Sequence, residues 1–341
     1  MIFEDKAILI TGGTGSLGRN LVRSIMTGKY GKPKQVIVFS RDEDKQYAME
    51  LEWKNLKVAT DDIIYYDSNI VTFRIGDVRD YESVVRAVKE ADIIIHAAAL
   101  KQVPVGEYFP WECIKTNVFG TQNIIRALIE NDHKVETMLA ISTDKACKPV
   151  NTYGMCKAIQ ERLVVEANLI HPKTRFICVR YGNVAASRGS VIPLFQEQIR
   201  NGGPVTITSQ EMTRFILSLD TATHTVSEAI RTADAGDIYV PDLPAVNIYE
   251  LAEIMIGKRD VKIQTIGVRP GEKIHEILIS EEEIPRTVKR GAYYVVRPIL
   301  PRMRKVKIAR PVLTKELSSA DYCMSRKDLK EFLKSGGYLN F

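Results

Sequence analysis

The sequence predicts an α/β protein with a doubly wound parallel β-sheet, followed by a smaller α/β domain. Three observations support this fold class. Apolar strand patterns alternate with amphipathic helix patterns to about residue 185, a glycine-rich turn follows the first strand, and the pattern beyond residue 185 is irregular. Alternation of this kind places helices on both faces of a parallel sheet. We therefore expect the first domain to end near residue 185.

The first strand leads into a turn that suits a phosphate group. Residues 7–10 form an apolar run, and a helix with apolar residues at helical spacing is expected to begin near Leu17. Gly12 allows the tight turn, Gly15 lets the backbone approach a pyrophosphate, and Gly18 lets the helix pack close to the strand. A glycine turn alone is weak evidence, but a second strand at 36–39 completes its required context. The expected nucleotide contacts are Gly12, Thr14, Gly15, Ser16, Leu17 and Gly18.

The residues after the second strand bear on which nucleotide binds. Ser40, Arg41, Asp42 and Lys45 stand where an NAD-preferring site usually has an acidic residue for the ribose hydroxyls. Arg41 suits a 2′-phosphate, so NADP is favoured over NAD. A solvated charged loop, or Asp42 on a ribose, is the alternative.

Two further strands are expected to border the same nucleotide. A third strand over 73–78 ends in Asp77 and Val78, which would embrace adenine. A fourth over 93–99 ends in small residues that would let the cofactor lie against the backbone, namely Ala97, Ala98 and Ala99. His96 within this strand is expected to be a packed structural histidine.

Proton-handling side chains gather after the next strand, expected over 135–142. Thr143, Asp144 and Lys145 follow it, and a helix over 153–166 carries Tyr153 and Lys157. A Tyr and a Lys at i and i+4 share one helix face, so the ammonium can stabilise phenolate and make Tyr153 a general base. The alternatives are one amphipathic turn with a snorkelling lysine, and an Asp144–Lys145 ion pair at the surface. A sixth strand over 176–180 would place Asn183 and Val184 at its carboxyl end, where ligands bind in such sheets.

Together these residues resemble the extended short-chain dehydrogenase/reductase family over nearly the whole chain, and within it the configuration-inverting UDP-N-acetylglucosamine 4,6-dehydratases. The Asp-Lys pair separates these from retaining dehydratases, which carry Asp-Glu at this place. The segments that carry the resemblance, besides the glycine turn and the Tyr153/Lys157 pair, are 40–43, 96–101, 142–146, 180–184, 187–191 and 269–273.

The resemblance implies a Rossmann-like NADP-binding domain over 1–185, to which 212–240 return, and a mainly substrate-binding domain over 186–341. Tyr153 would take the C4 hydroxyl proton while hydride passes to NADP. Lys145, with a depressed pKa, would remove the C5 proton, and Asp144 would protonate the departing C6 hydroxyl. Thr143 would hydrogen-bond the sugar or Tyr153.

The same resemblance implies UDP-N-acetylglucosamine or a related nucleotide sugar as substrate, and a homo-oligomer, with a hexamer among the expected assemblies. Arg214 is a weaker substrate candidate that could instead anchor a loop. The expected substrate contacts are Lys101, Asn183, Ser187, Arg188, Arg269 and Glu272.

Three other functions remain open at this point: a dehydratase that also epimerises, a UDP-hexose 4-epimerase, and a non-catalytic NADP sensor with the same fold. Product mass separates the enzymes, because a 4-epimerase product keeps the mass of its substrate. A sensor has little reason to keep Asp144, Lys145, Tyr153 and Lys157 together.

Composition excludes some other classes. The net charge is +6, with a basic excess at Arg302, Arg304, Lys305, Lys307 and Arg310. That run lacks interleaved aromatic residues, so a solvated or oligomer-facing segment is expected rather than a nucleic-acid site. The five cysteines show no Cys-x-x-Cys spacing, so we expect neither a zinc site nor disulfide bonds. The same pattern predicts that the protein works in a reducing compartment. There is no leader pattern and no apolar run approaching membrane-spanning length, so we expect a cytoplasmic protein without a membrane partner.

Two segments depart from the resembling family. Residues 54–67 look longer than the corresponding family loop, and residues 318–341 form an unexpected tail with an amphipathic pattern over 326–334.

Overall fold

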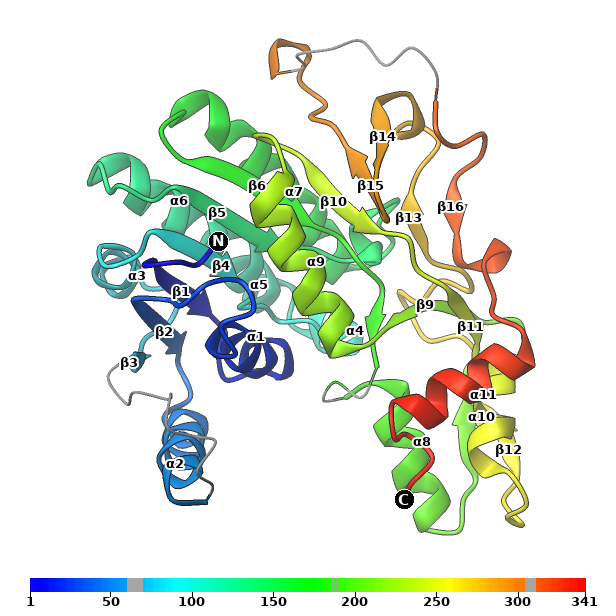
Figure 1. Cartoon of the computed structure of the whole chain (residues 1–341). Coiled ribbons are helices and arrows are strands. Elements are labelled where there is room, and N and C mark those ends of the chain that lie inside the picture. The colour runs from blue at the N-terminus through cyan, green and yellow to red at the C-terminus, as the bar shows by residue number, and fades with distance from the viewer. Residues whose placement is uncertain (60–69, 186, 188, 304–310) are drawn as a thin grey trace.

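A large twisted sheet forms the centre of the molecule in the computed structural model (Figure 1). The structure describes residues 1–59, 70–185, 187, 189–303 and 311–341. For residues 54–59 it describes the backbone alone. Within the described residues the sheet has nine strands. In spatial order they are β14 (Thr287–Arg290), β15 (Tyr293–Val296), β10 (Ile238–Pro241), β6 (Arg175–Val179), β5 (Thr137–Ile141), β4 (Ile93–His96), β1 (Ala7–Thr11), β2 (Gln35–Ser40) and β3 (Val71–Ile75).

The order β3-β2-β1-β4-β5-β6 is that of the doubly wound dinucleotide-binding fold, and these six strands run parallel, as the sequence predicts. Their central strands are apolar and buried on both faces, which a sheet covered by helices on each side requires. The strand order reverses between β1 and β4, so a ligand is expected at the carboxyl ends of these two strands.

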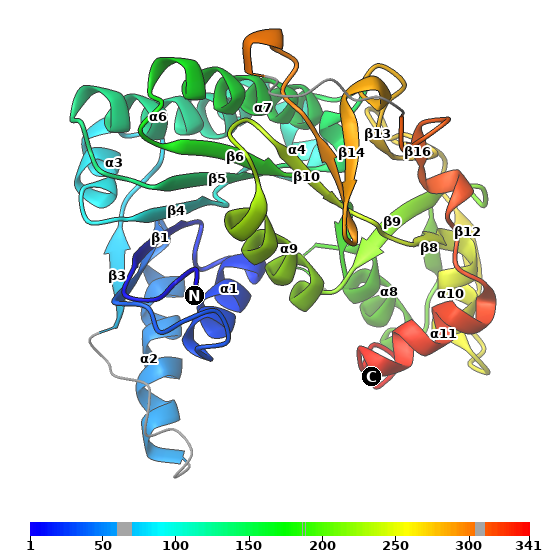
Figure 2. The ribbon, with the colours of Figure 1, turned by 45° about the horizontal axis from the view of Figure 1, so that its top comes forward.

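Helices cover both faces of the sheet (Figure 2). One face is covered by α3 (Tyr81–Val88), α6 (Gly120–Glu130) and α7 (Thr152–Ile170), and the other by α1 (Ser16–Met26) and α9 (Leu219–Thr232), which pack against one another within each layer. The remaining helices of this half are α2 (Glu43–Ala59), α4 (Val103–Tyr108), α5 (Pro110–Ile114), a π-helical turn η2 (Lys115–Phe119) and a 3-10 turn η3 (Asp144–Ala146).

The first helix begins within one residue of the predicted position, but two predicted strands end early. β3 is the edge strand and stops at Ile75 because its neighbour β2 ends at Ser40, the register partner of Ile75. β4 stops at His96 because its neighbour β1 ends at Thr11, where the glycine turn begins. Asp77, Val78 and the three alanines therefore lie in loops beyond the sheet rather than at the ends of strands.

A smaller lobe has a hydrophobic core of its own, built largely from α8, α10, α11 and the short strands between them (Figure 1). The elements of the second half outside the large sheet are β7 (Asn183–Val184), α8 (Val191–Arg200), β8 (Val205–Ile207), β9 (Thr213–Leu217), β11 (Ala245–Asn247), α10 (Ile248–Ile256), β12 (Ile263–Thr265), β13 (Ile277–Ile279), η4 (Ile284–Arg286), η5 (Pro301–Met303), β16 (Leu317–Ser318), η6 (Ser319–Asp321) and α11 (Arg326–Ser335).

Both departures from the family pattern can be located in part. The amphipathic tail forms α11, whose Leu329 and Leu333 are buried in the core of the smaller lobe. Residues 54–59 continue the backbone of α2, and the rest of the 54–67 segment lies outside the described residues. Arg302 of the basic run is exposed, and its members after residue 303 lie outside the described residues as well.

The chain crosses between the two halves several times. β10 pairs with β6 in the large sheet, and β14 and β15 extend that sheet by antiparallel pairing. We keep a division near residue 185 as a proposal, with 212–240 and the β14–β15 hairpin assigned to the large-sheet side.

A buried ion-pair network joins the halves around Arg180, which follows β6. Its guanidinium pairs with Glu161 on α7 at 2.6 Å and with Glu283 before η4 at 2.6 Å, and donates to the carbonyl of Leu278 at 2.9 Å. Glu161 also accepts a hydrogen bond from Ser142, at the end of β5. Burial alone would raise the pKa of Glu283, but the charge and hydrogen bonds of Arg180 outweigh burial and lower this pKa to about 2.

Replacing Glu283 by glutamine should destabilise the fold by about 3 kcal/mol at neutral pH, because Arg180 loses one buried partner and keeps only Glu161. A carboxyl whose folded pKa is depressed contributes stability above its usual pKa and loses it as pH falls. The difference from the wild type should therefore narrow between about pH 4.5 and about pH 2, the usual and folded pKa values of Glu283. Urea unfolding at several pH values measures it.

Glu316→Gln is the matched control, since Glu316 pairs with Lys148 at the surface. Its effect should stay below about 1 kcal/mol. Two outcomes would contradict the role of the network. One is an equal loss of unfolding free energy in the two variants, and the other is a loss in Glu283→Gln that stays constant from neutral to acid pH.

Candidate active site

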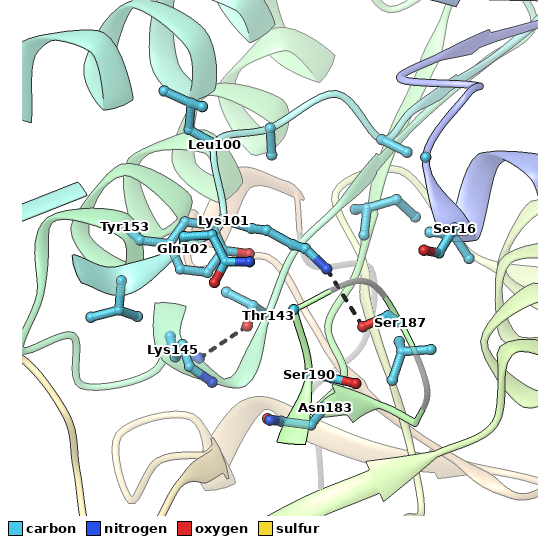
Figure 3. Close-up of a pocket in the computed structure, with 18 of the residues that line it drawn as sticks. Ser16, Leu100, Lys101, Gln102, Thr143, Lys145, Tyr153, Asn183, Ser187 and Ser190 are labelled. Atoms are coloured by element: carbon cyan, nitrogen blue, oxygen red, sulfur yellow. Dashed lines mark hydrogen bonds between the residues drawn. The ribbon is translucent and has the colours of Figure 1, made fainter. Parts of the chain in front are cut away.

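A cavity of about 680 Å³ runs along the carboxyl ends of β1, β2, β4, β5 and β6 and continues under the smaller lobe. It brings together side chains that are far apart in the sequence (Figure 3). The expected cofactor residues of the glycine turn and of the loops after the second, third and fourth strands all line it, as do Tyr153, Lys157 and Val184.

The glycine turn forms a cradle that a side chain would fill. Gly12 has a φ of +68°, and a Cβ there would lie 2.8 Å from the Ala98 backbone. A Cβ on Gly18 would lie 2.5 Å from Gly13, so only glycine lets α1 approach the turn. Gly15 is the N-cap of α1 and no side chain caps that end. The positive end of α1 faces this turn, and these residues fit the pyrophosphate of a dinucleotide.

The adenosine end of the cavity is basic. Arg41 is largely exposed, and its guanidinium lies 3.9 Å from Asp77. Asp77 turns away to Arg79, with a closest distance of 2.6 Å. The Asp42 carboxylate accepts a hydrogen bond from the Lys45 backbone N–H at 3.0 Å and pairs with the Lys45 ammonium. Asp42 is therefore engaged in starting α2, whereas Arg41 faces the cavity.

A buried hydrogen-bond chain connects the glycine turn to Lys157. The Thr11 hydroxyl lies 2.7 Å from His96 Nδ1, and His96 Nε2 lies 3.0 Å from Thr121 Oγ1. Gln160 donates to the same Thr121 oxygen and accepts from Lys157 Nζ at 2.8 Å. His96 is fully buried, as predicted, and burial lowers its pKa to about 3. It is a neutral structural histidine.

Lys157 has no carboxylate contact in this chain of hydrogen bonds. Its ammonium donates to the carbonyl of Ile141 at 2.8 Å and to Gln160. Burial lowers its pKa to about 8. Lys157 is thus oriented by neutral acceptors, which leave its charge uncompensated.

The prediction that Lys157 lowers the pKa of Tyr153 is wrong for this structure. Burial raises its pKa to about 12, against the opposing effects of the Lys145 charge and of a hydrogen bond to Thr143. The expected lowering of this pKa by Lys157 does not occur among the protein groups alone. Lys145, rather than Lys157, is the cation with the largest effect on the phenol.

Asp144 and Lys145 form a buried pair, so the alternative of a surface ion pair is wrong. Asp144 is 0 % exposed, and its Oδ1 accepts from Lys145 Nζ at 3.1 Å and from the Thr143 hydroxyl at 2.9 Å. Lys145 and Thr143 line the cavity, while Asp144 lies behind them. A Cβ on Gly154 would lie 2.2 Å from the Lys145 carbonyl oxygen, so this glycine lets α7 pack against the pair.

The expected depression of the Lys145 pKa is also wrong for this structure. Burial would lower it, but the carboxylates of Asp144 and Glu276 outweigh burial and raise the pKa above its usual value. The Glu276 Oε1 atom lies 3.2 Å from Lys145 Nζ. The sequence prediction missed Glu276, and only its place three residues after the 269–273 segment could have drawn attention to it.

The substrate residues lie toward the other end of the cavity. Lys101 extends across it to Ser187, with 3.5 Å between Nζ and Oγ (Figure 3). Asn183, Arg269 and Glu272 line the same part, and Arg188 lies outside the described residues. Arg214 is buried and donates to backbone carbonyls at 273 and 274, so it anchors that loop, which was the stated alternative to a substrate contact. Cavity residues that sequence reasoning missed include Gln102 and Thr208, which lie outside the segments of the resemblance, and Tyr181 and Ser190, which lie within the 180–184 and 187–191 segments.

The rest of the described chain offers few alternatives. No group of three or more His, Cys, Asp or Glu side chains there could hold a metal ion. The five cysteines are free. Within the part of the chain that the structure describes, no helix combines the length and apolar character needed to cross a bilayer.

Comparisons with known proteins give a family and two kinds of activity. A model of the polysaccharide biosynthesis protein family matches residues 8–298. An uncharacterized membrane protein of Methanocaldococcus jannaschii is 43% identical over 307 residues, covering 87% of each chain. A UDP-N-acetylglucosamine 4,6-dehydratase (inverting) of Campylobacter jejuni is 42% identical, covering 87% of this chain and 84% of its own. A UDP-glucose 4-epimerase of Rickettsia bellii is 43% identical, covering 86% and 83%.

Among solved structures, the X-ray structure of Pen from Bacillus thuringiensis has a TM-score of 0.89 and 33% identity, covering 99% of this chain and all of its own. The chain is thus similar at equal identity to a dehydratase and to an epimerase.

Proposed function

This chain belongs to the polysaccharide biosynthesis protein family, a family of extended short-chain dehydrogenases/reductases that includes nucleotide-sugar dehydratases and epimerases, and within it we propose that the chain is an NADP-dependent UDP-N-acetylglucosamine 4,6-dehydratase that inverts C5. The observation that carries this proposal is the buried Asp144–Lys145 hydrogen bond in the wall of the cavity that Lys145 and Tyr153 line. Oxidation and reduction at C4 need only Tyr153 and Lys157, whereas removal of water needs a second acid and a second base.

The pair can run a closed proton cycle. In the resting site Lys145 is an ammonium that donates to the Asp144 carboxylate. Moving this proton along the hydrogen bond gives a neutral amine and a carboxylic acid, the forms that elimination requires. Lys145 then takes the C5 proton, and the proton on Asp144 goes to the departing C6 hydroxyl, which leaves as water. Elimination therefore restores the ammonium and the carboxylate. When hydride returns to C6, C5 takes up one proton, which equals in number the C4 hydroxyl proton that Tyr153 removed, so the whole turnover neither gains nor loses a proton.

Thr143 connects Asp144 to the substrate. Asp144 does not reach the cavity, but the Thr143 hydroxyl does and bonds the same Asp144 oxygen. Asp144 can therefore give its proton to Thr143 Oγ1 while the Thr143 hydroxyl proton passes to the leaving group. In this form the acid role involves both residues.

Tyr153 and Lys157 serve the oxidation step. Oxidised NADP, which would be held by the glycine turn and beside Tyr153 and Lys157, would supply the acceptor for the C4 hydride and its donor to C6. Tyr153 takes the C4 hydroxyl proton, and its raised pKa means that nearby positive charge must assist this transfer. Lys157 remains fixed by Ile141 and Gln160 and supplies such a charge.

A UDP-hexose 4-epimerase is the second candidate, favoured by the Rickettsia bellii relative with that name. It would use the same fold and cofactor and leave Asp144 and Lys145 without a proton to move. A non-catalytic NADP sensor is a third, and it would leave the whole proton-handling set unused.

Mass spectrometry of UDP-N-acetylglucosamine incubated with the protein in deuterated water tests the proposal. We expect a product that has lost one water and gained deuterium at C5. Lys145→Ala should abolish this product while NADP still binds, because the base is lost and the glycine cradle is not touched. Normal dehydration by this variant would sink the base assignment, and a product of unchanged substrate mass would favour the epimerase.

The NADP preference rests on Arg41, and Arg41→Ala should separate the two cofactors. Losing charge-assisted hydrogen bonds to a 2′-phosphate should weaken NADP binding by about tenfold or more, with NAD binding nearly unchanged. Titration calorimetry with both nucleotides measures this. Arg23→Ala, which removes an exposed arginine paired with Glu52 on α2, is the control. Equal losses for NADP and NAD in the Arg41 variant would refute the preference.

We also propose that a second copy of the chain covers an apolar patch beside the cavity. The patch lies on α4, α5, η2 and α7, which pack against one another, and Trp111 and Phe119 meet there edge to face at 5.8 Å. Contiguous exposed apolar surface of this kind is typical of protein interfaces. Its exposed members are Val105, Tyr108, Phe109, Trp111, Phe119, Met155 and Ile159.

Trp111→Glu should reduce the assembly to single chains or to a smaller oligomer, because a charge would have to be buried in the interface. Light scattering after gel filtration gives the subunit number of wild type and variant. Val312→Glu, at an exposed apolar residue on none of the patch elements, should leave the mass unchanged. A wild type that runs as a single chain would end this proposal.

A further inference from the structure

A second carboxylate contacts Lys145, and the proton cycle proposed above does not use it. Glu276 is 2 % exposed and lines the cavity. Its Oε1 lies 3.2 Å from Lys145 Nζ, and Asp144 Oδ1 lies 3.1 Å from the same nitrogen. One ammonium therefore lies between two buried carboxylates, although a single acid would complete the cycle.

Other cations near Glu276 are occupied elsewhere. Lys273 Nζ is 3.7 Å from Glu276 Oε2 and donates to the Cys147 carbonyl at 2.7 Å instead. Arg214 Nε is 4.0 Å from Oε1, and both terminal nitrogens of Arg214 donate to backbone carbonyls. Glu276 Oε2 has no hydrogen-bond partner among the described residues. Lys145 is thus the cation that Glu276 meets most closely.

The backbone holds Glu276 rigidly in this place. Its N–H donates to Ser319 Oγ at 2.9 Å, and its carbonyl accepts from the Ser319 N–H at 2.8 Å. The next residue begins β13, which pairs with β16. A buried carboxylate costs free energy unless a nearby charge compensates it, so its fixed position beside Lys145 calls for a function.

Resting on the dehydratase function, we propose that Glu276 is a positioning residue that keeps Lys145 protonated and aimed at Asp144 until substrate enters, and that receives the ammonium again after elimination. The charge of Glu276 opposes early loss of the Lys145 proton and stabilises the ammonium formed when Lys145 takes the C5 proton. Glu276 itself neither gains nor loses a proton. It makes the base active only in the loaded site.

The charges around Lys145 agree with this role. Asp144 and Glu276 both favour the ammonium, Arg214 opposes it, and Tyr153 lies on the same cavity wall. The two carboxylates outweigh both burial and Arg214 and raise the Lys145 pKa above its usual value. Without Glu276, Asp144 would be the one carboxylate of the described residues that favours the Lys145 ammonium against burial and the Arg214 charge.

The test measures the charge of Lys145 directly in the full-length protein with NADP and without substrate. Short pulses of acetic anhydride label neutral amines, and mass spectrometry gives the labelling rate of Lys145 relative to Lys148 in the same sample. Lys148 is the internal reference because its partner is Glu316. In Glu276→Gln at about pH 9, Lys145 should label at least about tenfold faster than in the wild type, since one pKa unit changes the neutral fraction tenfold.

Two further variants separate charge from structure. Glu276→Asp keeps the charge and should restore slow labelling, whereas a purely structural role would disturb both variants alike. Glu316→Gln should change the labelling of Lys148 and leave Lys145 as it is. If Glu276→Gln does not fold, the wild type still decides: labelling of Lys145 as fast as that of Lys148 would overturn the proposal.

The pH profile of turnover completes the test. The falling limb of kcat at alkaline pH should move to lower pH in Glu276→Gln, because the Lys145–Asp144 pair then loses its shared proton to solvent more easily. Dehydration together with an unchanged labelling rate in this variant would overturn the role of Glu276 and leave the dehydratase function intact. If instead the wild type releases no water but Lys145 labels faster in Glu276→Gln, the dehydratase function is overturned. The control of the Lys145 charge by Glu276 then stands.

Discussion

The fold depends on one buried cation, the guanidinium of Arg180, and on the two carboxylates that compensate it. Glu161 comes from α7 and Glu283 from the segment before η4, so three parts of the chain converge on one charge. Removing one partner of a buried pair leaves an uncompensated charge, which costs more than a surface ion pair contributes. Glu161 also accepts a hydrogen bond from Ser142, so the network fixes the end of β5 relative to α7. Thr143, Asp144 and Lys145 follow β5, and α7 carries Tyr153 and Lys157.

Two lysines in the resulting cavity have opposite surroundings. Lys145 lies between carboxylates, and its pKa is raised, whereas Lys157 contacts a carbonyl and an amide, and its pKa falls to about 8. Titratable groups whose environments push their pKa values apart commonly have different catalytic roles. The first environment suits a group that exchanges protons with a partner, and the second suits a fixed charge. This contrast is the electrostatic argument for a dehydratase, since a 4-epimerase has use for only the second.

The sequence anticipated the parts of the site that local chemistry specifies. The glycine turn, the Tyr153 and Lys157 spacing and the Asp144–Lys145 neighbours are each set within a few residues. The structure places all of these except Asp144 on one cavity. The sequence did not anticipate Glu276, which is 131 residues from Lys145 in sequence and 3.2 Å from it in space. Nor did it foresee that Asp144 lies behind Thr143, because burial depends on what packs over a residue from elsewhere in the chain.

The sequence by itself determined the parallel sheet, the order of its first elements and the residues that can form a nucleotide cradle, because apolar periodicity and glycine positions act over short distances. Tertiary structure decided where strands end, as at Ile75 and His96, whose register partners Ser40 and Thr11 end the neighbouring strands. It also decided the addition of β14 and β15 to the large sheet and the direction of every pKa shift in the site. Those properties arise from desolvation and from charges brought together by packing, and no local pattern in the chain encodes them.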